Sequence, residues 1–281
     1  MPVYDQNYRP WEGRLLEKPS TWWVIARTGI RLLWQRWMIA LLFFATFPFI
    51  VRTVQIYFMN RVGDSSKLGE FGKNLDIDAG FFQGFLKNQE FVFLLILVTA
   101  GAGLIANDRR FKALQIYFSR PVSFSDYIGG KWLILAFFGS LVTWIPALLL
   151  FIIQWLLSGS EAFLRQFFWI PFSVLGSSLT ALLVLGGLML LLSSVASARG
   201  AAVLFFAVIW FGEILRKILI RIPEVGLLSL QADLRQVGSA LFGTERPFQF
   251  STVWAALVLA AFVAGCFLFL RTRIRPTEVV K

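Results

Sequence analysis

The chain has 281 residues, of which 57% are hydrophobic and 16% aromatic, and its formal net charge is +11. A soluble domain does not need so apolar a composition, so we expect an integral membrane protein. The chain has no histidine and a single cysteine, Cys266. A zinc, redox or Ser-His enzyme is therefore not expected, and we predict no catalytic residue and no metal site. The basic residues gather beside apolar stretches, which favours membrane orientation over nucleic-acid binding.

The N-terminal segment, residues 1–37, contains an amphipathic pattern. In "STWWVIARTGIRLLWQRWM" (20–38), apolar residues recur at helical spacing and arginines occupy the opposite face. The pattern predicts a helix that lies along the inner leaflet. Its role is either a simple membrane anchor or, in addition, the transmission of motion. The residues expected to act in it are Trp22, Trp23, Arg27, Arg31, Trp34 and Trp37.

Six apolar segments come close to the roughly 20 residues that cross a bilayer core. They are residues 38–58, 86–106, 132–157, 167–195, 201–220 and 251–270. They predict an all-α transmembrane domain over 38–270, followed by a basic cytoplasmic tail at 271–281. Basic residues concentrate in the N-terminal segment, in loop 107–131 and in the tail, which favours cytoplasmic N- and C-termini.

Two loops are expected on the outer side. Residues 59–85 are polar and rich in glycine, which indicates irregular structure. Residues 221–250 intersperse apolar and polar residues and predict one or two short amphipathic helices at the outer interface, with Pro223 and Pro247 as boundaries. The apolar residues of this pattern are Val225, Leu228, Leu234, Val237 and Leu241.

Two charged residues fall inside predicted spans. Arg52 and Glu213 lie about 21 Å and 18 Å from the inner ends of the first and fifth spans, so they share a height in the outer half. One hypothesis is that they pair and close an outer gate. The alternative is that Arg52 extends outward alone while Glu213 pairs with Arg216 or Lys217 on its own helix.

Loop 107–131 joins the second and third spans and holds a dense cluster of charge. After Asp108, "RRFKALQIYF" predicts a continuous basic helix, which Pro121 ends. Ser123 and Asp126 have the spacing of a capping box that starts the next helix. Gly129 and Gly130 permit close packing, and Lys131 is expected to anchor the base of the third span. A short helix held sideways in this way suits the receipt of force from a docked partner.

This loop resembles that of the permease subunits of ABC-2 type transporters, which ends in a "lSrPvs…e/dyllGK"-like run. The corresponding stretch here is "YFSRPVSFSDYIGGK" (117–131), and it departs from the family upstream, where "NDRRFKAL" replaces a Glu-x-x-x-Gly-Thr run. The likeness extends to six spans, an N-terminal interfacial helix, a helical loop before the last span and a basic tail, and so covers essentially the whole chain. The matching residues are Ser119, Arg120, Pro121, Val122, Ser123, Asp126, Tyr127, Gly130 and Lys131.

The resemblance implies a type V exporter-like architecture and a role as the membrane subunit of an ATP-driven exporter. Loop 107–131 would then dock into a separate ATPase subunit as a coupling helix. The chain has no G-x-x-x-x-G-K-[ST] motif, so ATP and magnesium would bind to the partner, and this chain would be neither an enzyme nor a cofactor carrier. The residues expected to contact the ATPase are Asp108, Arg109, Arg110, Lys112, Ser119, Arg120, Pro121, Ser123, Asp126 and Lys131.

The expected assembly contains two ATPase subunits and a second permease chain, identical or different, among the lipids of a plasma membrane, in a bacterium the inner membrane. No nucleic acid is expected as a partner. The small residues of "TAGAG" (99–103) would allow close helix contacts, either within one chain or at a dimer seam. The transported substrate does not follow from the sequence.

Three other classes of membrane protein are alternatives to this interpretation. An ion-coupled secondary transporter would be expected to have paired intramembrane carboxylates, and only Glu213 lies in the middle of a span. A non-transporting scaffold or assembly protein would fit the aromatic spans but leaves the sideways helix unexplained. An intramembrane enzyme is disfavoured because histidine and clustered acids are lacking.

Overall fold

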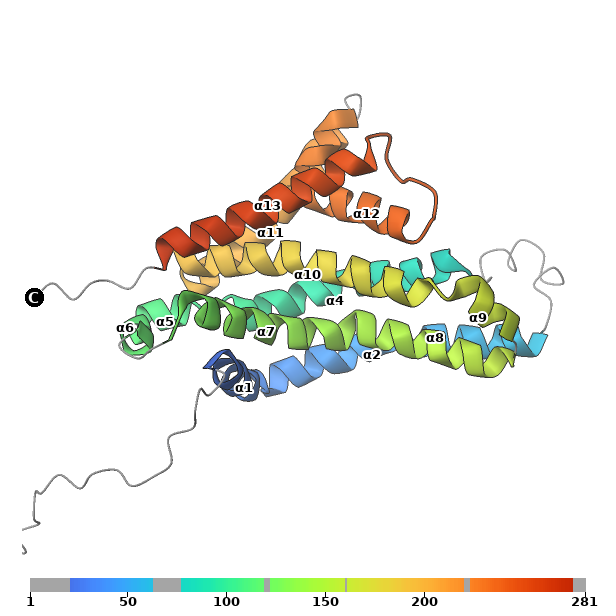
Figure 1. Cartoon of the computed structure of the whole chain (residues 1–281), viewed down its shortest axis with the longest axis horizontal. Helices are drawn as coiled ribbons and strands as arrows, with labels where there is room; N and C mark the ends of the chain where they lie inside the picture. The colour runs from blue at the N-terminus through green and yellow to red at the C-terminus, as the bar shows by residue number, and fades with distance from the viewer. Residues whose placement is uncertain (1–20, 63–76, 119–121, 160, 220–222, 275–281) are drawn as a thin grey trace, which may run out of the picture.

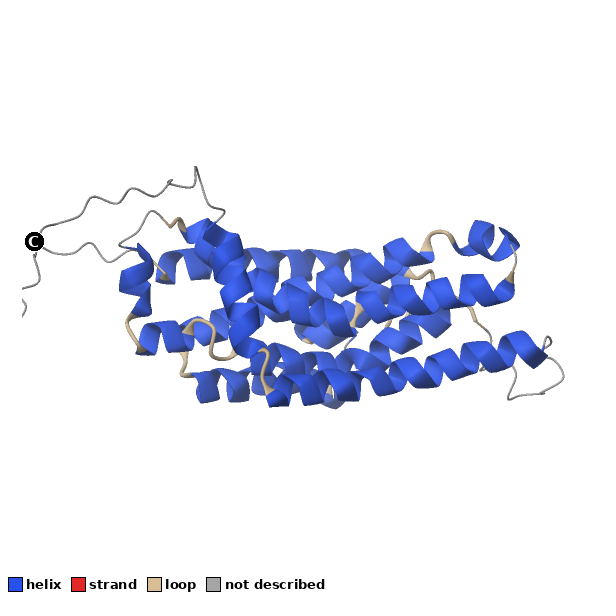
Figure 2. Ribbon diagram, turned by 90° about the horizontal axis from the view of Figure 1, so that it is seen from below, coloured by secondary structure: helices blue, strands red, loops and turns tan. Residues whose placement is uncertain are grey.

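The structure is a computed structural model that describes residues 21–62, 77–118, 122–159, 161–219 and 223–274. In this part of the chain all regular secondary structure is helical (Figure 2). Six of its helical segments are long and apolar enough to cross a membrane. They are Arg36–Arg61, Ala79–Arg110, Phe124–Ser158, Phe163–Val195, Ala198–Ile218 and Thr252–Arg273.

Figure 1 shows α2, α4, α7, α8 and α10 running along the long axis of the bundle, α11 and α13 inclined to it, and α1 viewed nearly end-on. Helices α4 and α10 lie in the middle layer, α2, α7 and α8 form one outer side, and α11, α12 and α13 form the other. The helices are α1 (Thr21–Leu33), α2 (Arg36–Val62), α4 (Ala79–Gly101), α5 (Ala106–Arg110), α6 (Ala113–Phe118), α7 (Phe124–Val142), α8 (Trp144–Ser158), α9 (Glu161–Phe167), α10 (Ile170–Val195), α11 (Ala198–Ile218), the 3-10 helix η2 (Pro223–Leu228), α12 (Leu230–Leu241) and α13 (Thr252–Arg273).

The six predicted spans are confirmed as helices of spanning length and composition, but most are longer than their apolar stretches. The prediction that residues 59–85 are irregular is wrong at both ends of this segment, because α2 continues to Val62 and α4 begins at Ala79. Asp78 fixes the start of α4, since its Oδ1 accepts a hydrogen bond from the Phe81 backbone N–H at 2.9 Å. Residues 63–76 of that loop lie outside the described residues.

The core forms where α4, α7 and α10 meet, with Phe93, Leu97, Phe138 and Met189 buried there. Gly101 lets α4 and α10 approach closely, because an added Cβ would lie 2.5 Å from the Met189 Cγ. This glycine of the "TAGAG" patch therefore serves packing within the chain. By contrast, α2, α11 and α13 expose many apolar side chains, as a surface that faces lipid requires.

The predicted amphipathic helix is present as α1, and it crosses α7 (Figure 1). It is shorter than predicted, because it ends at Leu33 and the chain turns at Trp34 and Gln35 before α2. Trp34 packs in this turn with its ring 6.0 Å from that of Phe138. The turn lets α2 run along the bundle while α1 lies across it, so Trp37 belongs to α2.

Segment 221–250 contains two short helical elements, as predicted, with Pro223 at the start of the first. The sequence pattern did not indicate which face of these helices turns inward. Helix α12 packs against α10, α11 and α13 and buries polar residues there, while Leu234 and Val237 are half-buried and Leu241 is exposed. The buried polar residues are Gln231, Asp233, Gln236 and Ser239. Tertiary hydrogen bonds explain this burial; for example, Gln236 Nε2 donates to the Phe248 and Phe250 carbonyls.

Candidate functional site

Those predicted partner-binding residues that the structure describes lie in an elbow between the second and third spans. We define the elbow as the described residues from 102 to 131, which comprise α5, α6 and the first turns of α7. Figure 1 shows it at one end of the bundle, beside α1, the end of α10 and the start of α11. We call this the elbow end and the opposite end, where α8 meets α9, the α9 end.

The elbow contains two short helices instead of the predicted continuous one. Helix α5 ends at Arg110 and α6 begins at Ala113. Between them, Lys112 has a φ of 56°, a left-handed conformation that is uncommon for residues other than glycine. The chain therefore turns sharply at Lys112, which the basic and apolar pattern of 108–118 did not indicate. Lys112 and Phe111 are both exposed at this corner.

The capping box at the start of α7 is confirmed. Ser123 Oγ accepts a hydrogen bond from the Asp126 N–H at 3.1 Å, and Asp126 Oδ2 accepts one from the Ser123 N–H at 3.3 Å. The two side chains therefore satisfy backbone donors at the helix start and hold its position. Ser119, Arg120 and Pro121, which were also predicted to act here, lie outside the described residues.

Asp108 and Lys131 face into the chain. Lys131 Nζ lies 2.7 Å from Asp108 Oδ2, and the two side chains are 8% and 17% exposed. Tyr127 Oη donates a hydrogen bond to the same Asp108 oxygen at 2.8 Å. Lys131 Nζ also lies 5.4 Å from the centre of the Tyr127 ring. These two residues, predicted to contact a partner, thus join α5 to α7, and only limited parts of them reach the surface.

Ser193 fixes the bend where α4 passes into α5. Its hydroxyl accepts hydrogen bonds from the Ile105 and Ala106 N–H groups at 3.0 Å and 3.1 Å and donates one to the Ala102 carbonyl at 2.9 Å. A second contact with α10 is the hydrogen bond that Arg109 Nη1 donates to the Ser194 carbonyl oxygen. Our sequence reasoning missed both serines. Their only signal was a Ser-Ser pair in an otherwise apolar stretch.

The outer side of the elbow is basic. Arg109, Arg110 and Arg199 border a cavity of about 650 Å³ between α5 and the turn from α10 to α11. Arg110 and Arg199 are exposed, and both residues between α5 and α6 are exposed beside them. Burial, and then the charge of Asp108, raise the pKa of the nearby Tyr117 in α6. The surface suits a negatively charged partner.

Helix α1 adds arginines at the elbow end, since Arg27 and Arg31 are exposed on it. Trp22 and Trp23 are about half exposed, and the face toward α7 is formed by smaller residues, including the buried Ala26. An added Cβ on Gly130 of α7 would lie 2.8 Å from the Trp22 carbonyl oxygen. The close approach of α1 to α7 therefore depends on this glycine.

Arg52 and Glu213, the candidate gate residues, do not meet within the chain. Arg52 donates a hydrogen bond to Gln55 Oε1 at 2.9 Å and lies over the Phe81 ring at 4.7 Å. Glu213 forms an ion pair with Arg216, three residues further on in α11. The gate hypothesis is corrected in this respect because α2 and α11 lie on opposite sides of the bundle (Figure 1).

In the described part of the chain, no group of His, Cys, Asp and Glu side chains could hold a metal ion. In comparisons with known proteins, no family model matches the sequence, and no curated protein shows significant similarity to it.

Proposed function

We propose that this chain is the membrane subunit of an ABC-2 type ATP-driven exporter. A separate ATPase subunit would bind the elbow and supply the energy. In this arrangement the elbow end faces the cytoplasm, the assembly holds two ATPase subunits and two membrane chains, and ATP and magnesium bind to the partner.

The observation that carries the proposal is the two-sided construction of the elbow. Its inner side is tied to α7 through Asp108 and Lys131 and to α10 through Ser193. Its outer side presents Arg110 and the exposed Phe111. A push on the outer side would reach the second, third and fourth spans together, because packed helices move as rigid units.

The basic cavity beside the elbow adds electrostatic support. Three arginines from α5 and α11 converge there without an acidic residue in the cavity lining. An acidic partner surface would therefore gain charge complementarity, which speeds association and sets orientation. The scaffold alternative gives no reason for a force-bearing joint in this position.

The proposal is tested by capture of an ABC-type ATPase subunit from membranes of the source cells, with the full-length tagged chain in lipid nanodiscs. Arg110→Glu reverses an exposed charge on the elbow, and we expect capture to weaken at least about tenfold. Arg165→Glu reverses another exposed charge, on α9 at the far end, and should leave capture unchanged. Equal capture by the two variants would contradict the docking site.

A second measurement tests the orientation. A chain with Lys112→Cys and Cys266→Ser carries its thiol at the exposed corner of the elbow. A membrane-impermeant maleimide should not label this thiol in intact cells and should label it once the cells are permeabilised. Labelling from outside would place the elbow on the wrong side and end the proposal.

A further inference from the structure

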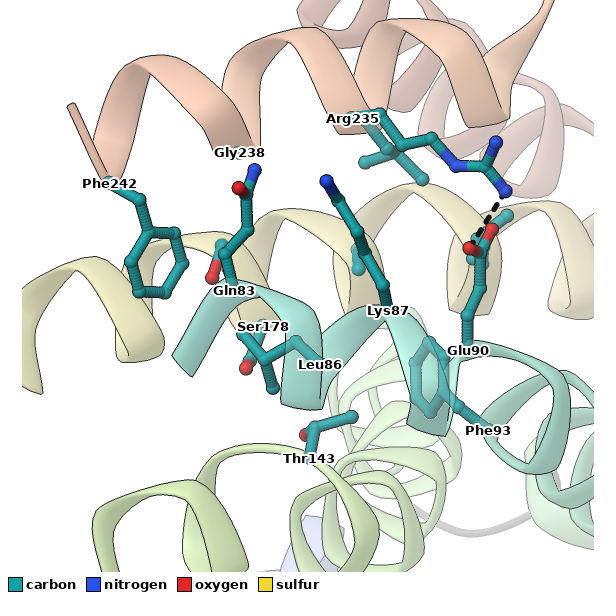
Figure 3. Close-up of a pocket in the computed structure, with 14 residues that line it drawn as sticks. Gln83, Leu86, Lys87, Glu90, Phe93, Thr143, Ser178, Arg235, Gly238 and Phe242 are labelled. Atoms are coloured by element: carbon teal, nitrogen blue, oxygen red, sulfur yellow. Dashed lines mark hydrogen bonds and ion pairs between the residues drawn. The ribbon is translucent and has the colours of Figure 1, made fainter. Parts of the chain in front are cut away.

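A second cavity lies between α4, α7, α10 and α12, away from the elbow (Figure 3). Its volume is about 100 Å³. A single water needs only about 10–15 Å³, so the cavity has room for a larger group. Most of its lining is apolar and includes Leu86, Phe93, Leu185 and Phe242. This composition is typical of a site for a hydrophobic chain or ring.

Charged residues border one side of this cavity. Arg235 of α12 and Glu90 of α4 form an ion pair at 3.0 Å, drawn as the dashed line in Figure 3. Gln231 Nε2 donates to the other Glu90 oxygen at 2.8 Å. Glu90 is therefore occupied by two partners. Lys87, one turn earlier in α4, is exposed and forms no ion pair with a described residue. The Lys87 ammonium is therefore a positive charge at this border that no described carboxylate neutralises.

The lining of this cavity contains a buried hydroxyl group whose hydrogen-bonding capacity is not satisfied by the described residues. Ser178 of α10 is 4% exposed and lines the cavity, and its hydroxyl has no hydrogen-bond partner in the described part of the chain. Thr143, also in the lining, already donates to the Gly139 carbonyl. A buried hydroxyl without a partner is costly, and a ligand oxygen or ester group would satisfy it.

We propose that this cavity binds an amphiphile with an anionic head group. The apolar part lies against Leu86, Phe93 and Phe242, and the head group meets Lys87. The apolar stretch of the second span begins at residue 86, so Lys87 lies at its outer boundary, where a long side chain can reach lipid head groups. A small free anion would leave the apolar lining unused, and an uncharged oil would leave Lys87 unpaired.

The binding of such a molecule does not require the ATPase. That the bound amphiphile is the exported cargo rests on the proposed function. Binding is therefore measured on the full-length chain alone, so its failure leaves the ATPase capture result unaffected.

The test is a lipid titration of the detergent-purified chain, followed by native mass spectrometry. The probes are phosphatidylglycerol, phosphatidylcholine with the same acyl chains, and inorganic phosphate as a competitor. We expect preferential binding of phosphatidylglycerol. Lys87→Gln should weaken it about tenfold, as expected for one lost charge-assisted contact. Lys217→Gln removes an exposed lysine of α11 outside the cavity and is the matched control. Ala181→Phe fills the cavity and should abolish the site.

Equal weakening by Lys87→Gln and Lys217→Gln would show that general surface charge attracts the lipid, and would overturn the proposal. Competition by inorganic phosphate would replace it with a free-anion site. Unchanged binding by Ala181→Phe would exclude the cavity as the place of binding. Should Ala181→Phe fail to fold, the comparison of the two lysine variants decides, because both replace exposed side chains.

Discussion

Lys131 of α7 and Asp108 of α5 form an ion pair of 2.7 Å that is largely shielded from solvent. The pair links the start of the third span to the helix that follows the second. Tyr127 satisfies the same Asp108 oxygen from one turn earlier in α7. Because this oxygen has two donors from one helix, α5 cannot move far from α7 without breaking both contacts.

Asp108→Ala is expected to lower the free energy of unfolding by about 3–5 kcal/mol, because it leaves the Lys131 charge buried without a partner. Asp108→Leu combined with Lys131→Met and Tyr127→Phe should recover much of this loss, since apolar side chains can replace a buried pair and the hydroxyl that donates to it. Denaturant unfolding in detergent measures both. The control is Glu161→Ala, which breaks an exposed pair with Arg165 and should cost less than about 1 kcal/mol. If Asp108→Ala lowered the free energy of unfolding by no more than Glu161→Ala does, the buried pair would not be essential for stability.

Gly129 and Gly130 allow a matched comparison. A Cβ on Gly130 would lie 2.8 Å from the Trp22 carbonyl oxygen and 2.9 Å from the Ile25 Cβ, whereas a Cβ on Gly129 would have no neighbour within 4 Å. Gly130→Ala should therefore displace α1 and cost about 1–3 kcal/mol. Gly129→Ala should stabilise α7 by up to about 1 kcal/mol, through helix propensity. The readouts are unfolding free energy and protease cleavage after Arg27. Shifts of the same sign would contradict the α1 contact.

These two glycines show which features the sequence could reveal. Adjacent glycines before a span predicted close packing, but nothing local distinguishes Gly130, which faces α1, from Gly129, which does not. The capping box was predictable because Ser123 and Asp126 are three residues apart and their interaction is local. The spans were predictable because their apolar length must match the bilayer.

Features that depend on distant partners were not predictable. Lys131 looked like a span anchor because its partner Asp108 lies on another helix. The inward polar face of α12 depends on groups such as the Phe250 carbonyl, which lies beyond the end of this helix. The break at Lys112 has no glycine or proline to mark it, so the helical pattern of α5 and α6 appeared continuous.

Asp233 predicts a pH dependence of stability. Its carboxylate oxygens are buried and have no hydrogen-bond partner in the described part of the chain. Burial raises its pKa from the ordinary 3.8 to about 8. Between these pH values the folded chain holds a proton that the unfolded chain has lost, so stability should fall as pH rises from about 4 to 8. Asp233→Asn should remove this contribution. Unfolding free energies measured across pH 5 to 8 provide the test, and an unchanged slope in the variant would contradict it.

Ser193 and its neighbour Ser194 provide the sharpest test of the elbow's connection to α10. Ser193→Ala leaves the Ile105 and Ala106 N–H groups without an acceptor in a buried place, and each such group costs about 1–3 kcal/mol. Ser194→Ala removes only a hydroxyl that donates to Leu191 within the same helix. It should cost less than about 1 kcal/mol, because the Ser194 carbonyl still accepts from Arg109.

The two serine variants also differ in where the damage should appear. Hydrogen exchange should become faster at Ile105 and Ala106 in Ser193→Ala, because these amides are then released from α10. The same amides should stay protected in Ser194→Ala. In the proposed exporter, Ser193→Ala should still capture the ATPase through the outer face of the elbow but couple hydrolysis poorly to movement of the fourth span. Unchanged exchange at both amides in Ser193→Ala would mean that this hydroxyl does not hold the bend, and the force would have to pass through the Asp108–Lys131 pair alone.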